Sequence, residues 1–204
     1  MDGVPDVFHQ YPLHLDASTK AVSAASLASD VALQNELKEL NTLHRQIIAL
    51  ETPQQMVPPP TPVNPKRSAQ ITKMQETAAA ASKKGNYKEA IGLYDFAIKM
   101  AQERPPWEAS GLAREELSGL YGARAQNFMA LQQWADGAVD AELALEMKKV
   151  GNTKAWMRRA QCLREMGRKE EALECVRFGL DYERPGPDKA GVAELETYLK
   201  ELEK

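Results

Sequence analysis

The chain has 204 residues, of which 43% are hydrophobic and 27% are charged, and its formal net charge is −3. This composition is typical of a globular protein and gives no indication of a nucleic-acid-binding or membrane-binding surface. No apolar run approaches the ~20 residues of a membrane-spanning helix, and residues 1–10 hold no basic region followed by an apolar stretch. We therefore expect no membrane span and no secretory signal, and a cytosolic or nuclear protein unless a partner anchors it elsewhere.

Prolines divide the chain into three parts. Six of the fourteen residues from 52 to 65 are proline, a density that cannot continue a helix and favours an extended polyproline conformation. We therefore predict an N-terminal segment over residues 1–51, a proline-rich linker over residues 52–65 and a C-terminal domain over residues 66–204.

The N-terminal segment has the pattern of a helical hairpin. Asp16 and Ser18 are candidate caps for a short first helix that ends near Ser29, and Asp30 is a candidate cap for a second helix. The second helix carries one apolar stripe: Leu33, Leu37, Leu40, Leu43, Ile47 and Leu50. The first helix offers too little apolar surface to cover this stripe. We expect the stripe to pack on the C-terminal domain or, as the linker favours, to dock on a partner protein.

An internal repeat marks the C-terminal domain, which we predict to be all-α. Three segments each place two small residues seven positions apart: Ala90 and Ala97, Gly137 and Ala144, Ala172 and Gly179. The 35 residues from Gly137 to Ala172 are close to the ~34-residue period of tetratricopeptide repeats, whose small residues let two helices approach closely. The longer spacing from Ala90 to Gly137 implies an insert that contains Trp107.

Large side chains at other repeat positions are expected to fill the core: Met74, Tyr87, Tyr94, Tyr121, Phe128, Trp134, Trp156 and Leu163. Cys162 and Cys175 lie in predicted helices, which favours buried, reduced thiols over a disulfide or a metal pair. A final helix carries one apolar face: Val192, Leu195, Tyr198, Leu199 and Leu202. We therefore predict three tetratricopeptide repeats closed by a C-terminal capping helix.

The first helix of each repeat lines the concave side of such a stack, so its residues decide what binds there. In the predicted third repeat, Lys154 and Arg158 are four residues apart and share one helix face. Six basic residues but only one acidic residue, Glu165, lie between residues 150 and 169. Such a face favours an anion, because arginine holds a carboxylate through two parallel hydrogen bonds and lysine adds a positive charge. A solvated helix face is the alternative.

The helix with Lys154 and Arg158 resembles the third repeat of chaperone-tail receptors. The resemblance implies that these two residues bind the C-terminal carboxylates of cytosolic 70- and 90-kilodalton heat-shock chaperones. Three positions depart from the receptor pattern, which has lysine or asparagine where this chain has Gln75, Ala79 and Ala123. We expect weak, salt-sensitive binding at one end of the tail. Gln126 and Asn127 are candidate substitute donors, and the other candidate groove contacts are Gln75, Lys83, Met157 and Gln161.

Nearly the whole chain also resembles the tetratricopeptide subunit of the fungal post-translational translocation complex, the Sec complex of the endoplasmic reticulum (ER). The likeness rests on the proline linker, on RPPWEASGLAREELSGLYGARAQ and on LEMKKVGNTKAWMRRAQCL. It implies a peripheral adaptor on the cytosolic face of the ER membrane. A membrane-anchored partner subunit would hold the N-terminal segment, and the repeats would receive chaperones that carry precursor proteins.

A structural scaffold, whose repeats pack permanently on a partner subunit, is the alternative that the three departures favour. Catalysis has no support in the sequence. His9, His14 and His44 show no metal-ligand spacing with another histidine or a cysteine, and Gly85 and Gly167 are turn residues. We expect a protein that is not an enzyme and that has no cofactor, no metal and no nucleic-acid partner.

Overall fold

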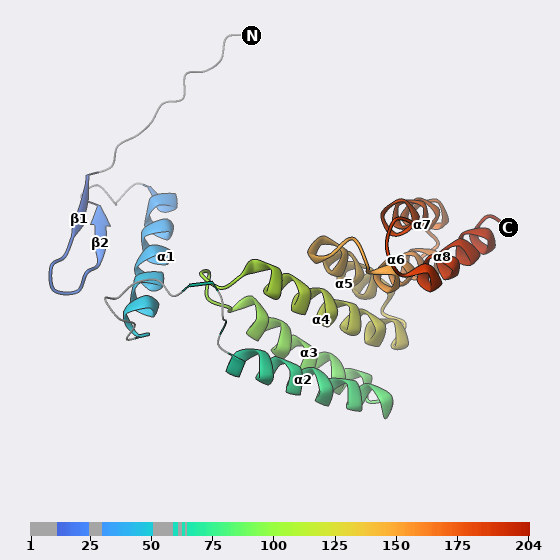
Figure 1. Cartoon of the computed structure of the whole chain (residues 1–204), viewed down its shortest axis with the longest axis horizontal. Coiled ribbons are helices and arrows are strands. Elements are labelled where there is room, and N and C mark those ends of the chain that lie inside the picture. The colour runs from blue at the N-terminus through green and yellow to red at the C-terminus, as the bar shows by residue number, and fades with distance from the viewer. Residues whose placement is uncertain (1–11, 25–29, 51–58, 61–62, 64) are drawn as a thin grey trace, which may run out of the picture. The chain divides into compact units, whose positions relative to one another are not determined.

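The computed structural model describes residues 12–24, 30–50, 59, 60, 63 and 65–204. The chain divides into two compact units, residues 1–59 and residues 60–204 (Figure 1), and each is described by itself. His9 and most of the predicted proline-rich linker lie outside the described residues. Within the described ranges, no helix combines the length and the apolar character that crossing a bilayer requires.

Residues 60–204 form a stack of α-helices (Figure 1): α2 (Pro65–Lys83), α3 (Tyr87–Gln102), α4 (Ser110–Ala130), α5 (Trp134–Met147), α6 (Thr153–Glu165), α7 (Lys169–Glu183) and α8 (Lys189–Leu202). Each helix packs on the next one along the chain. In addition, α2, α4, α6 and α8 contact one another in succession, and we call these four helices the inner row. This stack confirms the prediction of an all-α repeat domain with a final capping helix.

The small residues predicted at the helix crossings are buried. Ala90, Ala97, Ala144 and Ala172 have no exposed surface. Gly179 of α7 lies against the indole of Trp156 in α6, and a Cβ added to Gly179 would stand only 2.9 Å from Cγ of Trp156. The crossing of α6 and α7 is therefore closer than any side chain at position 179 would allow.

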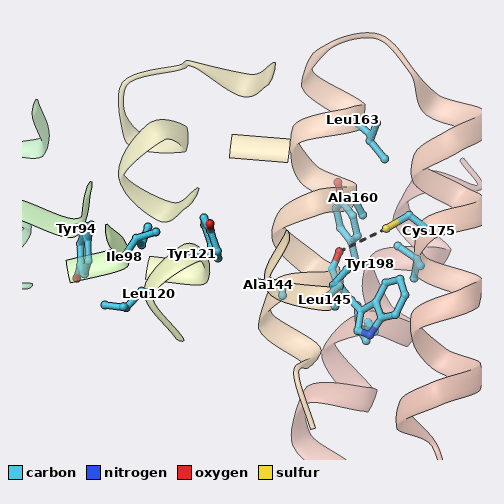
Figure 2. Packing of buried hydrophobic residues seen from close by; sticks show 14 of the residues in the cluster. Tyr94, Ile98, Leu120, Tyr121, Ala144, Leu145, Ala160, Leu163, Cys175 and Tyr198 are labelled. Carbon is cyan, nitrogen blue, oxygen red and sulfur yellow. Dashed lines mark hydrogen bonds between the residues drawn. The ribbon is translucent and has the colours of Figure 1, made fainter. Parts of the chain in front are cut away.

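The hydrophobic core of this unit is one continuous cluster that extends from α2 to α8. Figure 2 shows part of it, from Tyr94 and Tyr121 to Leu163 and Cys175. The Cys175 thiol donates a hydrogen bond to the Trp156 carbonyl, drawn as a dashed line. Burial raises the pKa of the Cys162 and Cys175 thiols to about 11. Both cysteines are free and buried, which confirms the prediction.

A buried arginine fastens the insert between α3 and α4. Arg104 donates to the carboxylates of Glu108 and Glu116 at 2.6–2.8 Å and to the Ser68 hydroxyl at 2.7 Å. Ser68 lies on α2 and Glu116 on α4, so one guanidinium ties the insert to both helices. Trp107, in the insert, is half-buried.

Residues 13–24 form a β-hairpin, so the prediction of a first helix in this region is wrong. Strand β1 (Leu13–Leu15) pairs antiparallel with β2 (Val22–Ala24). Asp16 caps the turn instead of a helix, because its Oδ1 accepts hydrogen bonds from the backbone amides of Ser18 and Thr19. These bonds, above all the one from the Thr19 amide, hold the pKa of the Asp16 carboxyl far below its usual range. Aspartate followed by serine and threonine favours a turn as readily as a helix start, and the turn prevails here.

The predicted second helix is present as α1 (Val31–Ile48), and the Asp30 side chain accepts a hydrogen bond from the Leu33 amide as its cap. Leu33, Leu37 and Ala24 form the small core of this unit, with Val22 packed against it. The described residues of this unit form a two-stranded hairpin that α1 covers (Figure 1).

We predict that Gly179→Ala lowers the free energy of unfolding by about 1–3 kcal/mol, because the added methyl group overlaps the Trp156 indole. Gly119→Ala is the matched control. Gly119 also lies within a helix, α4, but an added Cβ there meets no atom within 4 Å, so the substitution should be neutral or stabilise by about 0.5–1 kcal/mol. Urea denaturation of the two variants measures both effects. Equal changes in the two variants would contradict the close crossing of α6 and α7.

Candidate functional site

The predicted binding residues share one face of α6. Lys154, Met157, Arg158 and Gln161 recur at steps of three or four residues, a spacing that places them on the same side of a helix. Helix α6 lies in the inner row, where it contacts α4 and α8. The side chains on this face can therefore meet residues from both neighbouring helices.

A buried carboxylate from α7 holds the start of α6. Glu183 is fully buried, and its two oxygens accept hydrogen bonds from the backbone amides of Gly151 at 2.8 Å and Asn152 at 2.6 Å. A negative charge at this position also stabilises the helix dipole. The Thr153 hydroxyl donates to Asp188, the N-cap residue of α8, at 2.6 Å. The first residues of α6 are thus fixed to both α7 and α8.

Arg158 reaches from α6 to α4. Its Nε donates to Oε1 of Gln126 at 3.0 Å, and its Nη1 lies 3.3 Å from the position that a Cβ on Gly122 would occupy. Gly122 is buried in the interior of α4, so its missing side chain makes room for the guanidinium. Burial lowers the pKa of Arg158 from its ordinary value, and the nearby Tyr94 opposes that shift. Arginine nevertheless remains charged at neutral pH.

Arg158 differs from the other described arginines of residues 65–204 in its hydrogen-bond partner. Seven of these arginines bind carboxylates: Arg104, Arg124, Arg159, Arg164, Arg168, Arg177 and Arg184. Two more, Arg67 and Arg114, donate to backbone carbonyls. Arg158 instead donates to the neutral amide of Gln126. A half-buried cation without a carboxylate partner favours an external anion, since desolvating a lone charge is costly.

Lys154 adds a second positive charge one turn before Arg158. Its side chain is exposed, and it forms no ion pair with any residue that the structure describes. The pKa of Asp188 is lowered by hydrogen bonds from Thr153 and from the Gly191 amide, and also by the charge of Lys154. Three other basic residues of the predicted cluster, Arg159, Arg164 and Arg168, are paired with glutamates. The positive charge available to a ligand on α6 is therefore concentrated at Lys154 and Arg158.

A shallow depression of about 450 Å³ continues this face toward α8. Met157 and Gln161 of α6 line it, together with Thr197 and Tyr198 of α8. Two carboxylates, Glu194 and Glu201, line it as well. The electrostatics of the groove thus favour an anionic group at Lys154 and Arg158 and disfavour one in the depression.

The other predicted groove residues are placed less favourably for contact with a peptide bound at Lys154 and Arg158. Asn127 is buried and its amide nitrogen donates to the Ala123 carbonyl at 2.8 Å, an arrangement that does not favour the predicted role of Asn127 as a substitute donor. Gln126 is exposed beside Arg158. Gln75 and Lys83 lie on α2, and among the described residues no hydrogen bond links either of them to Arg158 or Gln126.

Three residues that shape this face were not predicted from the sequence. A glycine inside a helical pattern is a recognisable signal of close packing, and Gly122 carries that signal. Glu183 and Asp188 gave no local signal, because the groups that they bind lie 32 and 35 residues away along the chain.

The predicted docking residues of α1 are divided between core and surface. Leu33 and Leu37 are buried, whereas the side chains of Leu40 and Leu50 are 45% and 44% exposed. Leu43 and Ile47 are half-buried. The apolar stripe therefore covers the hairpin at one end of α1 and leaves Leu40 of α1 and Leu50, two residues past its end, uncovered.

No family model matches the chain. The chain is 36% identical over 150 residues to the ER protein translocation subcomplex subunit sec67 of Schizosaccharomyces pombe, a match that covers 72% of this chain and 78% of sec67. The chain belongs to the sec67 family. That family consists of translocation subunits and not of enzymes, in agreement with the prediction from the sequence.

Two solved structures share the fold of this sec67 family member. A chain of the Sec complex from S. cerevisiae has a TM-score of 0.63 at 23% identity, with 93% of this chain and 98% of that chain covered. The second tetratricopeptide-repeat domain of human RPAP3, solved in complex with the HSP70 peptide SGPTIEEVD, has a TM-score of 0.51 at 21% identity. That match covers 68% of this chain and 98% of the RPAP3 domain. The tetratricopeptide-repeat fold predicted from the 35-residue spacing is therefore confirmed.

We predict that Glu183→Gln lowers the free energy of unfolding by about 2–3 kcal/mol, because one buried acceptor is replaced by an amide donor that faces backbone N–H groups. Glu174→Gln, on the exposed side of the same helix, is the matched control and should change stability by no more than about 0.5 kcal/mol. Thermal and urea denaturation give both values. If the two variants were equally stable, Glu183 would not hold the start of α6.

Proposed function

We propose that this chain is a non-enzymatic adaptor of the ER protein translocation complex. Its repeat groove binds the acidic C-terminal tail of cytosolic heat-shock chaperones of the 70-kilodalton class and so brings precursor proteins to the translocon. Its N-terminal unit docks on a membrane-anchored subunit of the Sec complex, which holds the chain at the cytosolic face of the ER membrane. The observation that carries the peptide-binding part is the half-buried guanidinium of Arg158, which binds a neutral amide and, within the described part of the chain, no carboxylate.

The last residue of an acidic tail offers two carboxylates, one on its side chain and one at its chain end. We assign the terminal carboxylate to Arg158, whose Nη1 and Nη2 can form a bidentate pair while Nε stays on Gln126. Lys154 is exposed and lies one helix turn away. Its flexible side chain brings the ammonium group to the side-chain carboxylate of the last tail residue. Because Oε1 of Gln126 is engaged by Arg158, its amide nitrogen is left to donate to the peptide.

The rest of the tail runs along the inner row toward less specific contacts. Met157 and Gln161 supply an apolar and a polar contact beside the two cations. Gln75, Ala79 and Ala123 do not supply the charges and amides of the chaperone-tail receptors. The affinity should therefore depend on the two cations at one end, be near micromolar, about −8 kcal/mol, and fall with added salt.

A scaffold function is the second candidate, in which the repeats pack permanently on a partner subunit. The same three departures, with the burial of Asn127, favour it. The two functions differ in whether the inner row is accessible in the assembled complex, so peptide binding by the chain within the purified complex distinguishes them.

The chain should bind a peptide that ends in Glu-Glu-Val-Asp, and Lys154→Ala or Arg158→Ala should each weaken that binding at least about tenfold, which corresponds to 1.4 kcal/mol. Each substitution removes a charge-assisted contact that no other described residue replaces. Arg159→Ala is the matched control, because Arg159 is the next residue and is paired with Glu142. Isothermal titration of the full chain measures all three affinities. Equal affinities for the wild type, Lys154→Ala and Arg158→Ala would remove this site assignment.

The N-terminal unit yields a separate prediction. Replacing both Leu40 and Leu50 by glutamine should abolish co-purification of the chain with the Sec complex, because both side chains are large, apolar and exposed. Peptide affinity should not change, since these residues lie in the other unit. Glu36→Gln, at an exposed polar position of the same helix, serves as the control. Retention of the double variant in the complex would overturn docking through α1.

A further inference from the structure

The hairpin of the N-terminal unit presents two different edges. In an antiparallel pair, opposite residues alternate between hydrogen-bonded and non-hydrogen-bonded positions. The Asp16 amide donates to the Ala21 carbonyl at 2.9 Å, so the next pair in the register, Leu15 with Val22, is not hydrogen-bonded. The pair two residues further along, Leu13 with Ala24, is likewise not hydrogen-bonded. The backbone N–H and C=O groups of these residues therefore point away from the partner strand.

The edge formed by β2 is closed by a side chain of α1. The Asn41 amide accepts a hydrogen bond from the Val22 N–H at 2.7 Å and donates to the Val22 carbonyl at 2.8 Å. A carboxamide has the same donor and acceptor as a peptide group, so Asn41 takes the place that a third strand would have on this side.

The edge formed by β1 is open. Within the residues that the structure describes, no hydrogen bond reaches the outward N–H and C=O groups of Leu13 and Leu15. The two side chains are 57% and 59% exposed. They lie on the same face of the hairpin as their opposite residues Val22 and Ala24, which pack toward α1. Edge strands are commonly protected by charged residues or by proline, and Leu13–Leu15 contains neither a lysine, an acidic residue nor a proline.

The small buried core of this unit is a second reason to expect that a third strand pairs with β1. Among the residues of this unit that the structure describes, the buried core consists of Ala24, Leu33 and Leu37. A two-stranded ribbon is marginal by itself, and a third strand or further packing is generally required. A strand beside β1 would satisfy the open backbone groups and would cover Leu13 and Leu15 in the same step.

We propose that an extended segment of the membrane-anchored partner subunit adds to β1 as a third strand. Its apolar side chains alternate and lie beside Leu13 and Leu15. The inference rests on the proposed docking function and specifies its geometry. A partner helix could cover leucines of α1, but it could not pair with backbone groups that recur every second residue. The hydrogen-bonding requirement of β1 therefore selects an extended segment.

Residue-resolved amide hydrogen exchange tests this proposal on the full chain, free and within the purified Sec complex. We expect exchange of the Leu13 and Leu15 amides to slow more than tenfold in the complex. The His14 amide points into the hairpin and provides the internal control, with little change. As a matched pair, Leu15→Ser should weaken retention in the complex at least tenfold, and His14→Ser, on the opposite face, should leave it unchanged.

Four results would overturn the proposal. If the complex forms while Leu13 and Leu15 exchange as in the free chain, strand addition is wrong but docking stands. If the complex does not form through residues 1–59, both ideas fail. Amides that are already protected in the dilute free chain would show that the chain covers its own edge. Protection that appears only as the concentration of the free chain rises would identify a second copy as the occupant.

Discussion

A buried carboxylate determines where α6, the helix that carries Lys154 and Arg158, begins. Glu183 binds the backbone amides of Gly151 and Asn152 ahead of α6, and Thr153 binds the cap of α8. Helix α6 also lies so close to Gly179 that the Trp156 indole excludes even a methyl group there. These contacts hold α6 against α7 and α8. They fix the direction in which the side chains of Lys154 and Arg158 leave the helix.

The arginines of the described repeat unit are arranged so that few guanidinium groups remain for a ligand. Most arginines are satisfied by glutamate, aspartate or backbone carbonyls, and Arg124 is held by Asp95 and Asp140. Arg158 is satisfied only in part, by the Gln126 amide. A protein with a net charge of −3 can therefore present a local cationic site without a basic surface. Such a site selects carboxylates by position and geometry, and the net charge does not determine this choice.

The repeat unit could be predicted from the sequence because two helices can cross closely only where both carry small residues. Ala90 and Ala97, Gly137 and Ala144, and Ala172 and Gly179 are each seven residues apart, and all six are buried where helices cross closely. Lys154 and Arg158 are separated by one helix turn. The hairpin was missed because its strands have three residues each, too few for an alternating pattern to stand out. The hydrogen bond that Gln126 accepts from Arg158 and the burial of Asn127 could not be predicted from the sequence. They depend on which side of α4 faces Arg158, and adjacent residues on a helix face different directions.

The proposed function depends most on the contact between the guanidinium of Arg158 and the terminal carboxylate of an acidic tail. A double-mutant cycle measures this contact directly. It combines the wild-type chain and Arg158→Ala with two peptides ending in Glu-Glu-Val-Asp, one with a free C-terminal carboxylate and one with an amidated C-terminus. If the contact exists, the two changes are coupled by a free energy of about 1–3 kcal/mol. Additive effects, with a coupling near zero, would show that Arg158 does not contact the chain end.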